Sequence, residues 1–557
     1  MKTKLVIVAL FAAVCLSNAQ VLALGRLLII TNEEMKPAFE HYSEWKSLFG
    51  IPADIVTVEY IQTSYAGDSL QVKIRECLRD YHNNHQSDWA ILGGDIDIIP
   101  HMIVNSLRAH PAGDTYYTNL DGDWNANGND LFGEPPGYGD QTDYEPDIFV
   151  ARIPCVDSTQ AATVIRKLVE YQSCPADTNY QNEVLLMGTR VIVSIDKSED
   201  FYHPVETEYF LDTLIPHLPA NLNRTRLFEE ASQTVKTELS AGYGLIVNNS
   251  QAQWAGNFLT HWTTTPWHRD AIEFPFMADS MMNTGKYSVF FNSTCLNNCL
   301  SSTAAIGRHF MLNPNGGGVA YIGSSNLDWL AASYPDFCYD MMDLMFEDGY
   351  EIGKAFALAK AALTPSDAWL DNYRRFAYHA YMLLGDPQLS VFSDVPKTLR
   401  SSLSIPLTPG QMTFVVAVIS DSGESVAGAT VCLTQDSTVY VTRQTDGLGI
   451  ATFSDVLFEH EGLATIGMMK SGYLMHLDSV FVGACCLGVR GNVNGDQQDI
   501  CDLADLMFLV NYLLQGGAAP ECFDEADLNA DGSIDLSDEI YLTNYLFLGG
   551  QVPYDCQ

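Results

Sequence analysis

Positive charge is scarce in this 557-residue chain, which has 29 Lys and Arg against 69 Asp and Glu and a formal net charge of −40. Such a field repels phosphate backbones and anionic lipid surfaces, so it argues against a nucleic-acid partner. Long apolar runs are scarce too: after the amino terminus no stretch approaches the roughly 18 residues of a spanning helix, so no membrane span is predicted. Hydrophobic residues still make up 47 % of the chain, which excludes a mostly disordered protein.

The amino terminus has the order of a secretory signal. Two lysines precede an apolar run from Leu5 to Leu16, and small residues follow up to Ala19. We therefore expect residues 1–19 to be removed and the mature chain to be secreted, either extracellular or at the cell surface. Without Cys15, twelve cysteines enter an oxidising compartment, so disulfides are expected, although their pairing is not readable from sequence.

Residues 20–395 alternate short apolar runs with stretches of helical period. Strands are expected at Leu27–Thr31, Trp89–Leu92, Asp147–Ile153, Glu183–Met187, Gly244–Asn248, Tyr287–Asn292 and Gly318–Ile322. Helices are expected at Glu34–Phe49, Leu70–Tyr81, Thr159–Tyr171, Ser302–Leu312 and Asp336–Ala362. This alternation predicts an α/β fold with parallel strands covered on both faces, in which ligands bind at the carboxyl ends of strands.

Two further domains are predicted after residue 395. Between 396 and 486 the pattern changes to period-2 runs with turn signals, at Thr413–Ile419, Thr430–Thr434, Thr438–Thr442 and Ile450–Phe453. We expect a small β-sandwich there, immunoglobulin-like or transthyretin-like, with a spacer role. Residues 487–557 hold two acidic loops, each followed by an amphipathic helix.

The duplicated acidic loops have the ligand spacing of calcium sites. The second loop places oxygen ligands at positions 1, 3, 5 and 12, namely Asp527, Asn529, Asp531 and Asp538. The first copy offers Asn492, Asn494, Asp496 and Asp505, with an apparent insertion at Gln497–Gln498. We expect both to bind Ca²⁺; a solvated acidic turn is the alternative, and it carries more weight for the first loop.

These two loop–helix units resemble a type I dockerin over about residues 488–551. The resemblance implies calcium-dependent folding of the module and docking of its paired helices onto a cohesin module. Five apolar or aromatic residues are open to either the module's core or that interface: Leu506, Val510, Tyr512, Tyr541 and Tyr545.

A cysteine stands just past one of the expected buried strands. Cys295 follows Tyr287–Asn292 and precedes an expected helix cap at Ser301–Thr303, where backbone amides and the helix dipole would favour the thiolate. An ordinary half-buried cysteine is the alternative. Asp123–Glu134 is predicted to form a third calcium-type loop, with ligands at Asp123, Asn125, Asn127 and Glu134. The alternative interpretation is an Asn-Gly-rich turn that binds no ion.

The stretch Cys295–Ser325 resembles the gingipain-type cysteine peptidases, with further matches at Leu92–Asp95, Asp114–Tyr117, Asp121–Trp124, Val150–Pro154 and Gly385–Pro387. The resemblance covers roughly residues 26–393 and implies a caspase-like α/β/α catalytic region of two subdomains. It implies that Cys295 attacks the scissile bond of a protein or peptide substrate, that a His after the preceding strand takes the thiol proton, and that backbone N–H groups hold the oxyanion.

The position of that His is where this sequence departs from the family. Gln251 stands there, and an amide does not accept a thiol proton at neutral pH. His261 or His268 is a possible substitute, and a Cys295–Cys299 disulfide would block the nucleophile. Two functions therefore remain: a cysteine endopeptidase attached to a cohesin-type partner, or an impaired pseudopeptidase that acts in binding or assembly.

Overall fold

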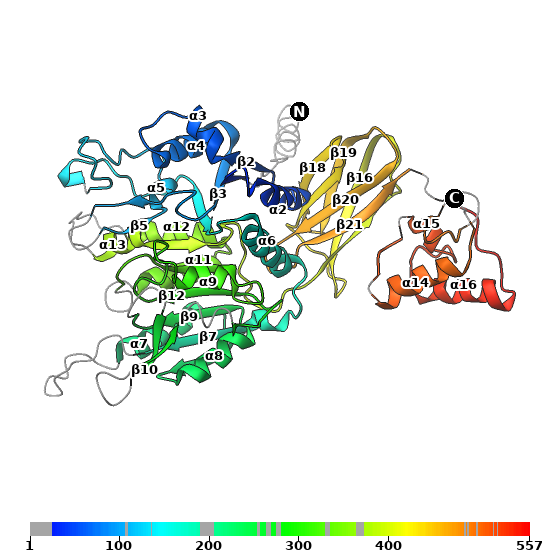
Figure 1. Ribbon diagram of the computed structural model, residues 1–557. Helices are drawn as coiled ribbons and strands as arrows, with labels where there is room; N and C mark the ends of the chain where they lie inside the picture. The colour runs from blue at the N-terminus through cyan, green and yellow to red at the C-terminus, as the bar shows by residue number, and fades with distance from the viewer. Residues whose placement is uncertain are drawn as a thin grey trace, which may run out of the picture.

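The structure is a computed structural model in which a large α/β region is followed by an all-β domain and a small helical module (Figure 1). It describes residues 25–556 except for 106–109, 135, 190–204, 253–256, 263–268, 274–279, 329–334, 364–372, 484–485, 487–489, 497–499, 516 and 521. The expected signal segment lies outside the described residues. No helix in the described ranges combines the length and apolar character that crossing a bilayer requires.

One ten-stranded sheet organises the α/β region. Its first half, in spatial order, is β2 (Ala53–Thr57), β1 (Arg26–Thr31), β3 (Ser87–Gly93), β6 (Phe149–Ile153) and β14 (Tyr381–Leu384). Its second half continues with β13 (Gly318–Ser324), β12 (Ser288–Ser293), β9 (Leu245–Asn249), β7 (Glu183–Gly188) and β8 (Asn223–Phe228). Strands are parallel within each half, and the halves run in opposite directions because β14 pairs antiparallel with β13.

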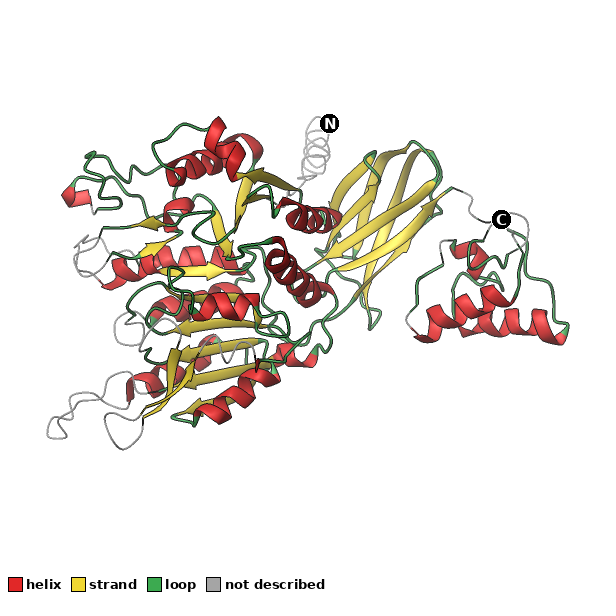
Figure 2. Ribbon diagram, in the orientation of Figure 1, coloured by secondary structure: helices red, strands yellow, loops and turns green. Residues whose placement is uncertain are grey.

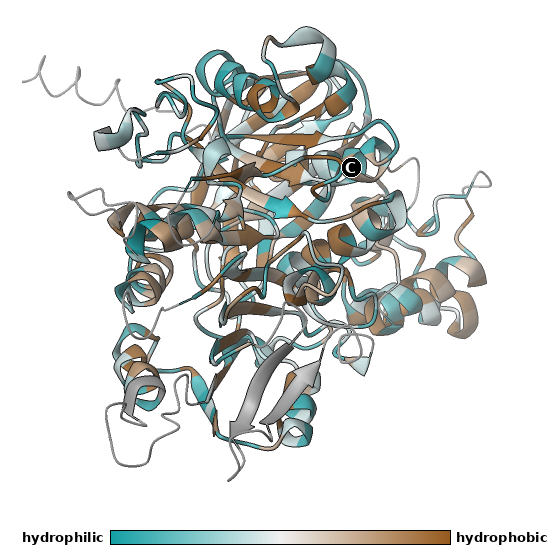
Figure 3. Ribbon diagram, turned by 60° about the vertical axis from the view of Figure 1, so that its left-hand side comes forward, coloured by the Kyte–Doolittle hydropathy of each residue, from teal (hydrophilic) through white to brown (hydrophobic). Residues whose placement is uncertain are grey.

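Helices cover both faces of this sheet (Figure 2). Successive side chains of a strand point to opposite faces, and β1 shows this directly: Leu27 and Ile29 enter one core while Leu28 and Ile30 enter another. The strands of the sheet are accordingly apolar along much of their length (Figure 3). The helices are α2 (Lys36–Leu48), α3 (Val58–Ser64), α4 (Leu70–His85), α5 (Thr115–Thr118), α6 (Ser158–Ser173), α7 (Val205–Leu214), α8 (Ser232–Ala241), α9 (Ile306–Leu312), α11 (Asp336–Phe346), α12 (Ile352–Ala362) and α13 (Tyr373–Ala380). Two short hairpins complete the region, β4–β5 (Met102–Ile103 and Ala112–Gly113) and β10–β11 (Asn257–Trp262 and Arg269–Glu273).

All seven strands expected from sequence are present, but three details of the expectation are wrong. The sheet is mixed rather than parallel, since β14 runs against β13. The single helix expected over Asp336–Ala362 is two helices, separated by a turn in which Gly349 has a φ of 71°. The helix expected from Ser302 begins only at Ile306.

The domain that follows is a sandwich of two sheets with one shared core. One sheet contains β15 (Leu399–Leu403), β16 (Gly410–Ser420) and β19 (Ile450–Phe458); the other contains β18 (Val439–Gln444), β17 (Thr430–Gln435), β20 (Gly462–Met469) and β21 (His476–Val482). The second sheet packs against the end of α2: the Cys432 thiol donates to the Ser47 carbonyl, and a Cβ on Gly467 would lie 1.8 Å from the Leu48 carbonyl oxygen. The contact is therefore close packing of backbone on backbone, for which Gly467 is required.

The carboxy-terminal module has its own small core. Helices α14 (Leu503–Gln515) and α16 (Leu536–Leu548) pack together, with the short α15 (Phe523–Ala526) between them in sequence. The core consists of Val493, Leu506, Leu509, Ala526, Leu528 and Leu542. Leu506 thus belongs to the core, whereas Val510, Tyr512, Tyr541 and Tyr545 are partly buried beside it.

Candidate active site

Cys295 and Gln251 follow two neighbouring strands. β9 and β12 are parallel, and Asn249 pairs with Ser293 at their carboxyl ends. Cys295 and Gln251 each lie two residues beyond this pair, and the Ser250 N–H donates to the Ser293 carbonyl at 3.1 Å. The sheet register therefore brings the two chain segments to the same edge.

The Cys295 thiol is half-buried and interacts with the backbone of Asp328. The Asp328 N–H donates to Sγ at 3.3 Å, and Sγ lies 3.9 Å from the Asp328 carbonyl, to which the thiol donates. Cys295 and Cys299 are both free thiols. The disulfide between them that the sequence left open is therefore not formed.

The turn after Cys295 is held in an unusual conformation. Leu296 has a φ of 58°, a region that favours glycine, and its N–H donates to the Asn326 carbonyl at 2.8 Å. The Asn298 N–H donates to the Ser324 carbonyl at 2.9 Å. Asn297 packs against Gly323, where any Cβ would lie 1.7 Å from the Asn297 amide oxygen. Several contacts from the end of β13 thus fix the backbone beside the thiol.

The Asp328 side chain connects three strands near this turn. Its Oδ2 atom accepts hydrogen bonds from Ser293 Oγ at 2.7 Å and from the Tyr381 hydroxyl at 2.9 Å, and Ser293 Oγ also lies 3.3 Å from Asn249 Oδ1. Tyr381 reaches this edge because β14 is antiparallel to β13, which places the amino end of β14 beside the carboxyl end of β13. Asp328 and Tyr381 were not predicted from the sequence, in which the available signal was that Asp328 closely follows Ser324–Ser325 at the end of a buried strand.

The environment of Cys295 opposes ionisation of the thiol. Burial raises the pKa of Cys295 to about 11, and the Asp328 carboxylate adds to this rise. The expectation that backbone amides and a helix dipole favour the thiolate is wrong, because burial and the Asp328 charge raise the pKa of Cys295 instead. Both effects therefore favour the neutral thiol.

Among the described residues, the Cys295 thiol is hydrogen-bonded to the backbone of Asp328 and to no imidazole. Gln251 is half-buried. His261 belongs to β10, but its side chain lies outside the described residues, and so does the whole of His268.

Asp328→Asn is expected to lower the pKa of Cys295, because the substitution removes the negative charge while leaving the backbone bonds to Sγ possible. The thiolate fraction then rises at any pH below the native pKa of about 11. The pH dependence of Cys295 alkylation by iodoacetamide, followed by peptide mass spectrometry, measures this shift. Asp348→Asn, at an exposed position, is the matched control. An unchanged profile in Asp328→Asn would contradict the electrostatic role.

The predicted calcium loop at Asp123–Glu134 closes around Glu134. The side-chain amides of Asn127, Asn129 and Asn105 donate to the Glu134 carboxylate at 2.8, 2.8 and 3.1 Å. Burial alone would raise the pKa of Glu134, but these bonds hold it below its usual value. Asp123 Oδ1 accepts the Asn125 N–H at 3.1 Å. The four predicted ligands lie in one loop, and calcium binding there stays a prediction.

This loop supports the edge that holds Cys295. Trp124 is buried and packs edge-on against His379, two residues before Tyr381. The Arg375 guanidinium donates to the Gly133 carbonyl. The loop therefore packs on α13, the helix that leads into β14 and Tyr381.

In the carboxy-terminal module the predicted carboxylate ligands of each loop influence one another electrostatically. Burial raises the pKa of Asp538, and the charges of Asp527 and Asp531 add to the rise. The same holds in the first loop for Asp505, which is buried and close to Asp502 and Asp496. Carboxylates that repel one another are oxygen donors of the kind that a hard dication such as Ca²⁺ takes, and calcium binding by these loops stays a prediction.

Comparisons with known proteins agree with this geometry. A family model described as "Peptidase family C25" matches residues 23–392, and one described as "Dockerin type I domain" matches residues 490–547. Lys-gingipain W83 of Porphyromonas gingivalis is 20 % identical over 485 residues, covering 82 % of this chain and 25 % of that protein. An uncharacterised protein of Archaeoglobus fulgidus is 24 % identical over 248 residues, covering 40 % of this chain and 55 % of that protein. The chain thus spans about a quarter of the gingipain relatives it matches.

Solved structures show the same fold. The crystal structure of the Arg-specific cysteine proteinase gingipain R (RGPB) aligns with a TM-score of 0.62 at 15 % identity, over 82 % of this chain and 98 % of that one. The complex of the Porphyromonas gingivalis RgpB pro- and mature domains aligns with a TM-score of 0.63 at 16 % identity, over 82 % of this chain and 100 % of that one.

Proposed function

Because this chain belongs to peptidase family C25 and carries a type I dockerin domain, we propose that it is a secreted, cohesin-attached protein that binds peptides at its Cys295 edge without cleaving them efficiently. The observation that carries the proposal is that the Cys295 thiol is hydrogen-bonded to the backbone of Asp328 and, among the described residues, to no imidazole. Burial and the Asp328 charge favour the neutral thiol, and Gln251 at the expected base position has no capacity to remove its proton.

A peptide-binding role is consistent with the rest of the edge. The backbone beside Cys295 is held by contacts to Ser324 and Asn326, and Asp328 is anchored by Ser293 and Tyr381. A fixed backbone of this kind supports recognition whether or not bond cleavage follows. On this proposal the chain keeps the fold of the family, and it differs at position 251, where Gln stands in place of the expected proton-accepting His.

An active endopeptidase is the second candidate, and one observation favours it: Cys295 and Cys299 are both free, so the nucleophile position is chemically available. In that case a histidine elsewhere in the chain takes the thiol proton, because position 251 is Gln, and the sequence offers His261 and His268 as candidates.

The test compares the native chain with Cys295→Ala, using fluorogenic peptides that contain Arg or Lys, the residues for which the relatives are named. We expect both proteins to bind the peptides with similar affinity, measured by fluorescence anisotropy, and to release them intact, measured by mass spectrometry. Hydrolysis by the native chain that is lost in Cys295→Ala would overturn the binding proposal in favour of the endopeptidase. A failure of both proteins to bind any peptide would contradict both candidates.

Attachment to a cohesin-type partner is proposed from a repeated apolar face on the module. Both long helices have exposed apolar residues at their first, fifth and twelfth positions, a spacing that puts them on one helix face. On α14 these are Leu503, Met507 and Leu514, and on α16 they are Leu536, Ile540 and Phe547, all more than half exposed. Single exposed apolar residues are ordinary, but a matched pair of such faces indicates a protein-binding surface.

Calcium is proposed as the ion that holds the module together, with Asn492, Asn494, Asp496 and Asp505 around one ion and Asp527, Asn529, Asp531 and Asp538 around the other. When bound, each ion would neutralise carboxylates that otherwise repel one another. Chelation is therefore expected to unfold the two helices. Far-ultraviolet circular dichroism of the full chain should lose helical signal when EGTA is added and regain it with excess Ca²⁺, while Mg²⁺ serves as the control ion. An unchanged spectrum under EGTA would contradict the calcium proposal.

A further inference from the structure

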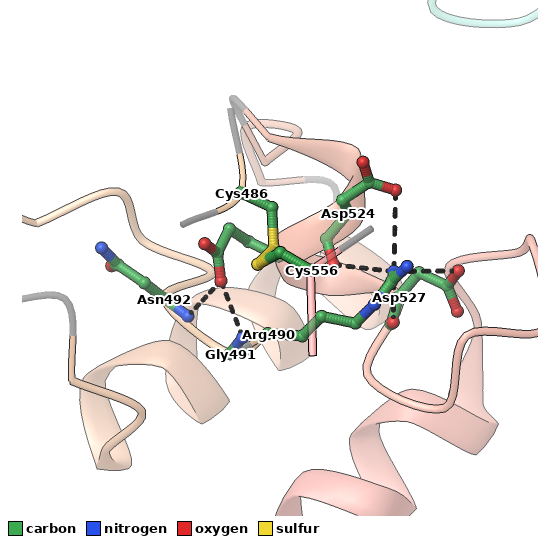
Figure 4. Close-up of a disulfide and its surroundings, with 8 residues drawn as sticks. Cys486, Arg490, Gly491, Asn492, Asp524, Asp527 and Cys556 are labelled. Atoms are coloured by element: carbon green, nitrogen blue, oxygen red, sulfur yellow. Dashed lines mark hydrogen bonds and ion pairs between the residues drawn. A yellow bond between two sulfur atoms is a disulfide. The ribbon is translucent and has the colours of Figure 1, made fainter. Parts of the chain in front are cut away.

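The two loops of the carboxy-terminal module contact each other through the residues that precede them. Arg490 lies two residues before Asn492, the first ligand of loop one, and Glu525 lies two residues before Asp527, the first ligand of loop two. These two side chains occupy the same place in the two repeats. Each of them reaches across to the start of the other loop (Figure 4).

Arg490 binds the start of the second loop. Its buried guanidinium donates through one nitrogen to the carbonyls of Asp524 and Asp527, both at 2.9 Å, and lies 3.3 Å from Asp527 Oδ2. The other contacts of the Asp527 carboxylate come from its own loop, from the N–H groups of Asp531 and Gly532. The orientation of this ligand therefore depends on both repeats.

Glu525 binds the start of the first loop. Its buried carboxylate accepts the N–H of Gly491 at 2.8 Å and that of Asn492 at 3.0 Å through the same oxygen. Hydrogen bonds from backbone N–H groups to an ionised carboxylate are stronger than those between neutral groups. They fix the backbone of Asn492, the residue whose side chain begins the predicted ligand set.

The two ends of the module are joined to each other beside these contacts. A disulfide joins Cys486 to Cys556, and the Arg490 N–H donates to the Tyr554 carbonyl at 2.9 Å. Figure 4 shows the disulfide close to Arg490, and a carboxylate oxygen of Glu525 lies within 4.8 Å of both sulfur atoms. The joined ends of the module therefore hold the side chains of Arg490 and Glu525 within reach of the opposite loop.

We propose that the two loops bind calcium as one coupled pair, with Arg490 and Glu525 as the positioning residues that transmit the coupling. The proposal rests on the calcium binding proposed above. Ordering of the second loop by an ion fixes Asp527 and the adjoining backbone, and with them Arg490 and Glu525; Glu525 in turn holds the first loop in its binding conformation. By linkage, the effect of each site on the other is equal.

The test uses hydrogen exchange with mass spectrometry on the full-length oxidised chain during a Ca²⁺ titration, reading Gly491–Asp496 and Asp527–Asp538 separately. Asp531→Ala disables the second loop without touching either positioning residue. We expect it to raise the Ca²⁺ midpoint of the first loop about tenfold, within the usual range of coupling between sites. Asp496→Ala should raise the midpoint of the second loop by a similar factor.

Glu525→Leu tests whether Glu525 transmits the coupling between the loops or only stabilises the module. In this background, Asp531→Ala should shift the midpoint of the first loop by less than about twofold, because the connection is already lost. Glu539→Leu removes an acid from α16 away from these contacts and should leave the tenfold shift intact. If Asp531→Ala abolishes protection of the second loop and leaves the first-loop midpoint unchanged, the coupling is overturned while calcium binding stands. Absence of Ca²⁺-dependent protection in both loops overturns the calcium proposal and the coupling together.

Discussion

Gln251→His is expected to raise the rate at which Cys295 reacts with a peptidyl thiol reagent near neutral pH by about 10²- to 10⁴-fold, the usual contribution of a positioned acid–base group. The register of β9 and β12 brings position 251 and Cys295 to the same edge of the sheet, which is where an imidazole would have to lie to take the thiol proton. Formation of an imidazolium would also offset the effects of burial and of Asp328, which now raise the pKa of the thiol.

Two controls test whether the added imidazole and Cys295 are responsible for the faster reaction. Gln251→Asn changes the same position without adding a base and should leave the rate unchanged. Gln251→His combined with Cys295→Ala should abolish labelling and any new hydrolysis, which assigns the signal to Cys295. A native rate already as high as that of Gln251→His would show that another group serves as the base.

Removal of the Cys486–Cys556 disulfide has the second large expected effect. The bond closes a segment with a sequence separation of 70. The chain-entropy relation then gives a loss of at most about 4 kcal/mol in the free energy of unfolding of the module when both cysteines are replaced by alanine, because Cys522 within this segment is also disulfide-bonded. Urea unfolding in saturating Ca²⁺, read by hydrogen exchange of α14 and α16, measures the change in the full chain.

The matched control for this experiment is Cys174→Ala, which replaces an exposed free cysteine in the α/β region. That variant should leave the stability of the module unchanged. A loss below about 1 kcal/mol in the double-alanine variant would mean that the unfolded module remains compact without the disulfide, so that closing the loop gains little.

Much of the fold was readable because the buried strands are continuous apolar runs with helical stretches between them. β14 was not: it has only four residues, Tyr381–Leu384, and follows α13 without a turn signal. Its direction depends on pairing with β13, which is distant in sequence. Local pattern carries no information about such a partner, so the mixed character of the sheet was missed.

The candidate site shows the same division. Cys295 was found because it follows a strand, and Gln251 was found through the family resemblance. Asp328 and Tyr381 join the site only because the two halves of the sheet meet at β13 and β14. The expected activation of the thiol was wrong for a related reason: burial and the charge of Asp328, a residue distant in sequence, raise the pKa of Cys295.

The Cys486–Cys556 disulfide also has a mechanical consequence. Cys486 follows shortly after β21, so any pull between the β-sandwich and the partner proposed to bind α14 and α16 would enter the module at Cys486. The disulfide passes part of that load directly to Cys556 at the opposite end of the module. Peeling of the first loop from one end would require the second end to move with it. A tether attached through both ends of a module resists such unzipping better than one attached through a single strand of chain.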